Sequence, residues 1–119
     1  MWYGSAKVGI PEIDLEHSNL DTMLQLYFSG AVPETYLENI VIGVERHFEH
    51  EAQLIEELGA TFPPEHRVAH QGICEKLERR LREVSANLVD GGVVAEEIRA
   101  LLLLHVVEYD IELKKLIPD

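Results

Sequence analysis

The chain has 119 residues, enough for one domain built around one hydrophobic core. Its composition, 46% hydrophobic and 27% charged, is that of a globular protein, and no apolar run reaches the ~20 residues of a membrane span. A formal net charge of −12 argues against nucleic acid and anionic membrane surfaces as partners. One cysteine, Cys74, excludes an internal disulfide, and with no secretory signal we expect a cytoplasmic protein.

The positions of helix-breaking residues and the periodicity of apolar residues predict an extended N-terminal arm over residues 1–11, followed by helices. The first helix should run from about residue 12 to residue 28, and Gly30 follows it where a left-handed residue is preferred. The second should open at Pro33, whose missing N–H is harmless there, and stop at Gly59.

Pro63 and Pro64 open a third predicted helix, whose apolar stripe continues to Leu88. A turn at residues 90–92 precedes a fourth helix, whose apolar stripe extends to Leu116. Strand signals are missing, since the chain has no sustained period-2 alternation. We therefore expect an all-α fold, a single domain over residues 1–119 forming an up-down-up-down antiparallel four-helix bundle, with the arm along or across its outside.

Seven polar residues fall on the predicted apolar faces of these helices or at their margins. They are His17, His47, Glu51, His66, His70, His105 and Asp110. Buried polar groups without partners cost several kcal/mol each, so something must pair with them. Neutral imidazole and carboxylate groups suit iron, zinc or manganese, and this set is too large for one ion. The pattern predicts a site for two metal ions.

The spacing within each helix supports this interpretation. His47 and Glu51 are four residues apart, as are the two histidines of the third helix, so each pair shares a helix face. Asp110 does not follow this spacing. It comes five residues after His105, so its side chain is rotated by about 140° around the helix axis from that of His105, and its carboxylate must reach the site from the edge of the apolar stripe. His50 points about 100° away from the stripe, and we expect it to be exposed.

Through four sequence elements, which follow one another in chain order, the chain resembles the hemerythrin family, specifically its bacterial single-domain members. They are Gly9-Ile10 through Ile13-Asp14 to His17, His47-Phe48-x-x-Glu51, His66-x-x-x-His70 and His105-Val106-x-x-x-Asp110. The resemblance covers nearly the whole chain. It implies a non-haem di-iron centre with a bridging oxo or hydroxo group, which binds O₂ reversibly and accepts small anions.

The resemblance also implies roles for the ligands. His47, His66 and His70 would hold one iron, and His17 and His105 the other, which keeps an open position for O₂. Glu51 and Asp110 would bridge the two irons. Apolar side chains must cover the open position and exclude water from it, and we call this surface the dry wall. Its candidates are Leu20, Leu24, Leu101, Leu102 and Val106.

Two departures from the family pattern bear on kinetics and leave the ligands untouched. The family often has tryptophan four residues before the last histidine, where this chain has Leu101, so we expect a roomier or more permeable pocket. It also often has a second glutamate after the bridging one, where this chain has Ala52.

Two other functions stay open beside O₂ carriage, storage or delivery. One is enzymatic, as a di-iron peroxidase, oxidase or nitric-oxide-handling protein. Ferritin-like enzymes use Glu-x-x-His pairs, and no histidine here has a glutamate three residues before it, so we expect binding and not turnover. The other is sensing of O₂, redox state or NO. Because Asp119 lies just past the last predicted helix, we expect no output domain unless the chain is part of a longer protein.

Overall fold

The computed structural model describes residues 7–118. Within this part of the chain there are four α-helices, one 3₁₀ helix and no strand, which confirms the all-α prediction. The elements are α1 (Pro11–Phe28), α2 (Tyr36–Glu57), α3 (Pro64–Ser85), α4 (Gly91–Glu108) and η2 (Asp110–Leu116). None of the described helices is long and apolar enough to cross a membrane.

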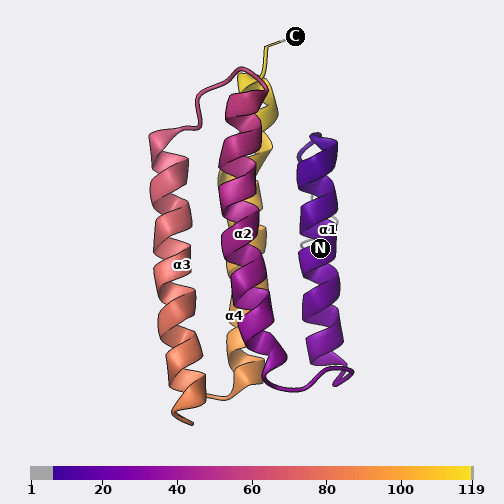
Figure 1. Ribbon diagram of the computed structural model, residues 1–119, viewed down its shortest axis with the longest axis vertical. Helices are drawn as coiled ribbons and strands as arrows, with labels where there is room; N and C mark the ends of the chain where they lie inside the picture. The colour runs from indigo at the N-terminus through magenta and orange to yellow at the C-terminus, as the bar shows by residue number, and fades with distance from the viewer. Residues whose placement is uncertain (1–6, 119) are drawn as a thin grey trace.

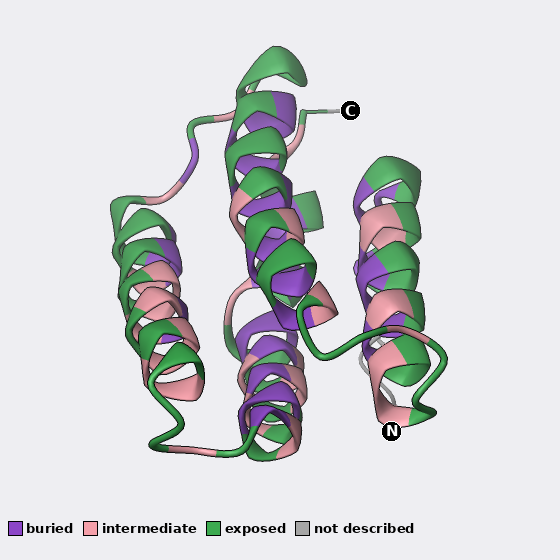
Figure 2. Cartoon of the chain, turned by 60° about the horizontal axis from the view of Figure 1, so that its bottom comes forward, coloured by how far each residue is buried: buried purple, intermediate pink, exposed green. Residues whose placement is uncertain are grey.

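The four helices lie side by side in an elongated molecule of 48 × 24 × 20 Å, an arrangement compatible with a four-helix bundle. Figure 1 shows that their connections alternate between the two ends of the molecule. α1 packs against α2 and α4, and α3 packs against the same two helices. The buried positions form stripes on the inward sides of the helices (Figure 2). Each helix therefore presents one face to a shared interior.

The segment before α1 is fixed by a carboxylate of the helix itself. Asp14 accepts hydrogen bonds from the backbone N–H groups of Val8 (2.7 Å) and Gly9 (3.1 Å). Gly9 has φ +92°, a left-handed conformation that favours glycine. Val8 and Ile10 are buried in the core, so this end of the predicted arm packs inward and not along the outside. Residues 1–6, with Trp2, lie outside the described residues.

The predicted helix boundaries hold within a few residues, except at the end of the fourth helix. Residues 33–36 form a turn, closed by the Tyr36 N–H on the Pro33 carbonyl at 2.9 Å, so α2 starts later than predicted. α3 ends at Ser85, before the left-handed Asn87 (φ 58°), which leaves Leu88 exposed and off the stripe.

The largest departure is in the fourth helix. The α-helix stops at Glu108, Tyr109 leaves helical geometry (φ −124°, ψ −57°), and the chain continues as the 3₁₀ helix η2. The tighter winding changes which side chains face inward. Leu113 is buried whereas Leu116 is exposed, so the predicted continuous stripe to Leu116 is wrong.

The start of α4 leaves no space for a side chain at Gly91. A Cβ there would lie 2.3 Å from the Tyr27 hydroxyl oxygen. We expect Gly91→Ala to destabilise the protein by about 1–3 kcal/mol in denaturant unfolding, because the aromatic ring must move. Gly72→Ala is the matched control, since that glycine lies in α3 with nothing within 4 Å of its Cβ position. The control should be neutral or stabilising by about 0.5–1 kcal/mol.

Tyr27→Phe removes the contacting oxygen and should recover part of the loss caused by Gly91→Ala. Equal losses with and without that hydroxyl would show that the contact is not the cause.

Candidate metal centre

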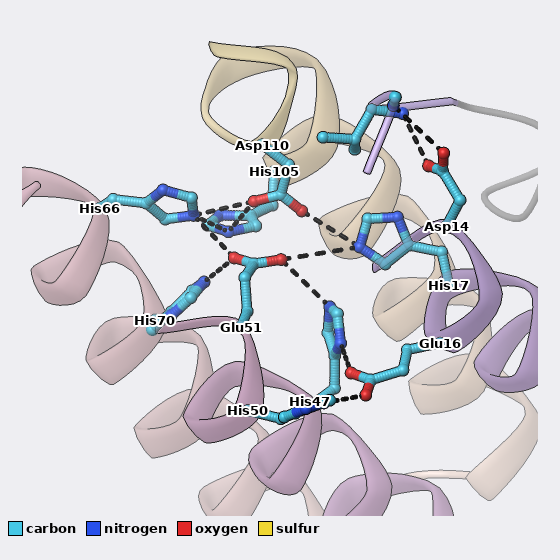
Figure 3. Close-up of polar contacts among 12 residues, drawn as sticks. Asp14, Glu16, His17, His47, His50, Glu51, His66, His70, His105 and Asp110 are labelled. Carbon is cyan, nitrogen blue, oxygen red and sulfur yellow. Dashed lines mark hydrogen bonds and ion pairs between the residues drawn. The ribbon is translucent and has the colours of Figure 1, made fainter. Parts of the chain in front are cut away.

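The structure brings all seven predicted ligand residues together in the interior. Each is at most 6% exposed, and Glu51 and His17 are fully buried. Every α-helix contributes, and Asp110 comes from the first residue of η2 (Figure 3). His50, on the outer side of α2, is exposed, as expected from its position on the helix.

The break at Tyr109 is what brings Asp110 inward. The Tyr109 N–H makes the last α-helical hydrogen bond, to the His105 carbonyl at 2.8 Å, and the chain then turns. Asp110 is 1% exposed, with Oδ1 only 3.1 Å from His105 Nε2. Its carboxylate therefore lies inside the cluster and not at the edge of a continuing helical stripe.

The two carboxylates lie between two groups of histidines. Glu51 Oε1 is 3.2 Å from Nε2 of both His66 and His70, while its Oε2 is 3.4 Å from His47 Nε2 and 3.8 Å from His17 Nε2. Each oxygen of this one carboxylate thus faces a different pair of imidazoles (Figure 3).

Asp110 repeats the arrangement. Its Oδ1 is 2.8 Å from His66 Nε2 and close to His105 Nε2, whereas its Oδ2 is 3.3 Å from His17 Nε2. The ligand atoms consequently form two groups, each compact enough to surround one metal ion. One is His66, His70 and His105 with Glu51 and Asp110, and the other is His17 and His47 with the same two carboxylates.

This grouping corrects the expected assignment of the histidines. The resemblance placed His47 with His66 and His70, and His105 with His17. The structure instead pairs His47 with His17 and places His105 beside His66, with their Nε2 atoms 2.9 Å apart. Sequence spacing shows which face of its helix a histidine occupies, but not how the helices are offset along their axes.

The donor atoms fit a bound cation better than they fit one another. Both oxygens of Glu51 and of Asp110 are buried without a hydrogen-bond partner among the described residues, as are Nε2 of His47 and of His70. The Nε2 atoms of His66 and His105 face each other, although two neutral imidazoles can share only one proton there. Convergent lone pairs in a buried site are what a metal ion requires.

The charge of the cluster follows from these contacts. Burial alone would raise the pKa of the Glu51 carboxyl, but its contacts with His17, His47, His66 and His70 outweigh burial and hold that pKa well below the usual range. The pKa of Asp110 is lowered for the same reason, against burial, by His105, His17 and His66. Both carboxylates are therefore anionic, as metal ligands must be.

Aromatic rings enclose the three-histidine group. The Phe48 ring stacks on His70 with centroids 3.8 Å apart and planes at 5°, and the Phe62 ring lies 4.5 Å from His66. Tyr109 stacks on His105 at 5.1 Å. Phe48 follows His47, Tyr109 precedes Asp110 and Phe62 lies four residues before His66, yet the sequence did not assign these rings to the site. Adjacency in a helix does not place two side chains together, because neighbouring positions point about 100° apart.

Of the five residues predicted to form the dry wall, four are buried in the core: Leu20, Leu24, Leu102 and Val106. Leu20 borders a hollow between α1 and α2 beside His47. Leu101 is half-buried and borders a smaller hollow between α3 and α4 beside His105. Leu20 thus lies next to a ligand of the two-histidine group, and Leu101 lies next to a ligand of the three-histidine group.

Sequence analysis missed Glu16. This α1 residue accepts a hydrogen bond from His47 Nδ1 at 2.7 Å, and its other oxygen contacts His50 Nδ1 (Figure 3). Burial would raise the pKa of Glu16, but these two hydrogen bonds lower it below its ordinary value. Adjacency to His17 was the available signal. Neighbouring helix positions point about 100° apart, however, so adjacency alone does not place Glu16 at the site.

An acidic groove of about 690 Å³ lies between α2 and α3 and reaches His70. Glu45, on its border, has a pKa raised to about 7 by partial burial, a hydrogen bond with Glu78 and the charge of Glu49. Because the folded-state pKa lies above the ordinary glutamate pKa of 4.5, folding favours the protonated form. That contribution is full below pH 4.5 and is lost as the pH rises to about 7.

Glu45→Gln should therefore raise the melting temperature by several degrees at pH 8, with the gain shrinking toward pH 4.5. Thermal unfolding monitored by circular dichroism across this range measures it. Glu57→Gln, at an exposed position of the same helix, is the charge-matched control. A gain that is equal at all pH values would contradict the acid–acid contact.

No protein-family model matches the chain, and neither a curated protein nor a solved structure does. The assignment of a function therefore depends on the geometry of the site itself.

Proposed function

We propose that this protein is a di-iron O₂-binding protein of hemerythrin type, folded as an up-down-up-down antiparallel four-helix bundle with an N-terminal arm. One observation carries the proposal. Glu51 and Asp110 each direct one oxygen to the three-histidine group and the other to the two-histidine group. Two carboxylates shared in this way are the arrangement expected of bridging ligands between two metal ions.

His66, His70 and His105 would hold one iron, and His17 and His47 the other. Counting the shared carboxylates, the first group offers five protein ligands and the second four. The two-histidine position is therefore the one with more room for an exogenous ligand, and it is the proposed place for O₂ or a small anion. When bound, the irons would supply the electrons that hold O₂ and take them back on release.

The residues of the chain support binding in preference to turnover. Most of the donors are neutral imidazoles, and the two carboxylates are held anionic by their contacts with them. The apolar residues around the ligands, with Leu20, Leu24, Leu101, Leu102 and Val106 as the proposed wall, would keep water from the site and limit proton leakage. A carrier needs both properties, since it must release O₂ unchanged.

The first test is the metal content. Anaerobic reconstitution with ferrous iron should give two irons per chain and a higher melting temperature than the metal-free protein, because ions that bind only the folded state stabilise it. His70→Ala should lower the iron content. Gln71→Ala, at the exposed neighbouring position, should retain two irons. One iron or none in the reconstituted wild type would reject the dinuclear proposal.

The second test concerns reversibility. The ferrous protein should gain an oxygen-to-iron charge-transfer band in air and lose most of it on deoxygenation, over several cycles of visible spectroscopy. Rapid one-way conversion to a ferric form, with continuous consumption of peroxide or NO, would favour the enzyme over the carrier.

A further inference from the structure

The contact between Glu16 and His47 has a consequence for one of the two metal positions. His47 Nε2 faces the shared carboxylate of Glu51, so this nitrogen must be free of a proton to bind a metal ion. The proton of a neutral imidazole then lies on Nδ1, where Glu16 Oε1 accepts it at 2.7 Å. Glu16 thereby selects the tautomer that His47 needs as a ligand.

The surroundings hold the Glu16 carboxylate in this place. Its second oxygen contacts His50 Nδ1, so a histidine one turn away on α2 fixes the other half of the group. The Glu16 side chain is 26% exposed, whereas the His47 side chain is 3% exposed. The carboxylate thus closes the outer side of a buried imidazole, at the border of the hollow between α1 and α2.

Glu16 and His17 are consecutive residues of α1, yet both act on the two-histidine group. His17 reaches the shared carboxylates directly, while Glu16 reaches across to the histidine supplied by α2 (Figure 3). The three-histidine group, drawn from α3 and α4, has no contact with Glu16 among the described interactions. An effect of Glu16 should therefore be confined to one metal position.

We propose that Glu16 is a positioning residue that orients His47 and selectively tightens metal binding at the two-histidine position. The inference rests on the proposed dinuclear centre. A carboxylate on the outer nitrogen of a ligand histidine fixes the ring and raises its basicity, and the loss of such a partner costs about 10–100-fold in metal affinity. Glu16→Gln removes the charge at nearly constant shape, and Glu16→Ala removes the acceptor as well.

The test is an anaerobic titration of metal-free protein with Co²⁺ in competition with a chelator, followed by visible absorption. Wild type should bind two ions. Glu16→Gln should weaken one of them by about 10–100-fold, Glu16→Ala at least as much, and both should leave the other within about twofold. Glu12→Gln is the matched control, since it removes the same charge from an exposed position one turn earlier on α1 and should change neither ion.

A second readout separates positioning from a general structural effect. In the Co²⁺-loaded protein, the exchangeable Nδ1 proton of His47 should give a paramagnetically shifted NMR signal, which moves or exchanges faster in Glu16→Gln while the other shifted signals stay. The metal-free variants should keep the wild-type helical content by circular dichroism.

The results of the Co²⁺ titration distinguish the role of Glu16 from the dinuclear proposal. Two ions in the wild type with unchanged affinities in both Glu16 variants would overturn this inference and leave the dinuclear proposal standing. Equal weakening of both ions would show a global effect and also overturn it. Fewer than two ions in the wild type would reject both proposals together.

Discussion

The structure depends on the burial of two anionic carboxylates among five imidazoles. Glu51 and Asp110 are almost completely inaccessible to solvent, and charges in such a place are costly unless something compensates them. The histidine nitrogens around them lie between 2.8 and 3.8 Å from the carboxylate oxygens. Each α-helix must place its histidine, or in α3 both histidines, in the same small volume, and this requirement fixes how the helices lie relative to one another.

The fold meets this requirement with regular helices on three sides and an irregularity on the fourth. His47 with Glu51, and His66 with His70, use the four-residue repeat of a helix face, so α2 and α3 need no distortion. His105 and Asp110 are five residues apart and cannot share a face, and the chain resolves this by leaving the α-helix at Tyr109. The departure from regular structure falls where the site demands it, and the displaced Tyr109 ring then covers His105.

The sequence predicted the class of fold and the members of the cluster because both are properties of single helices. Apolar periodicity, prolines and glycines locate a helix and its buried face, and His17, His47 and His66 each lie on such a face. The features of the site that the sequence could not predict depend on contacts between helices. The pairing of His47 with His17, the inward turn of Asp110 and the reach of Glu16 across to α2 all follow from axial offsets and from a break at Tyr109 that no glycine or proline marks.

The central claim is that two metal ions share Glu51 and Asp110. Anomalous diffraction at the iron edge, from crystals of the iron-loaded protein, tests it most directly. Our account predicts two peaks about 3.5–4 Å apart, the separation typical of two-metal sites, with both carboxylates between them, three histidines at one peak and two at the other. A single peak, or two peaks with no carboxylate in common, would contradict it.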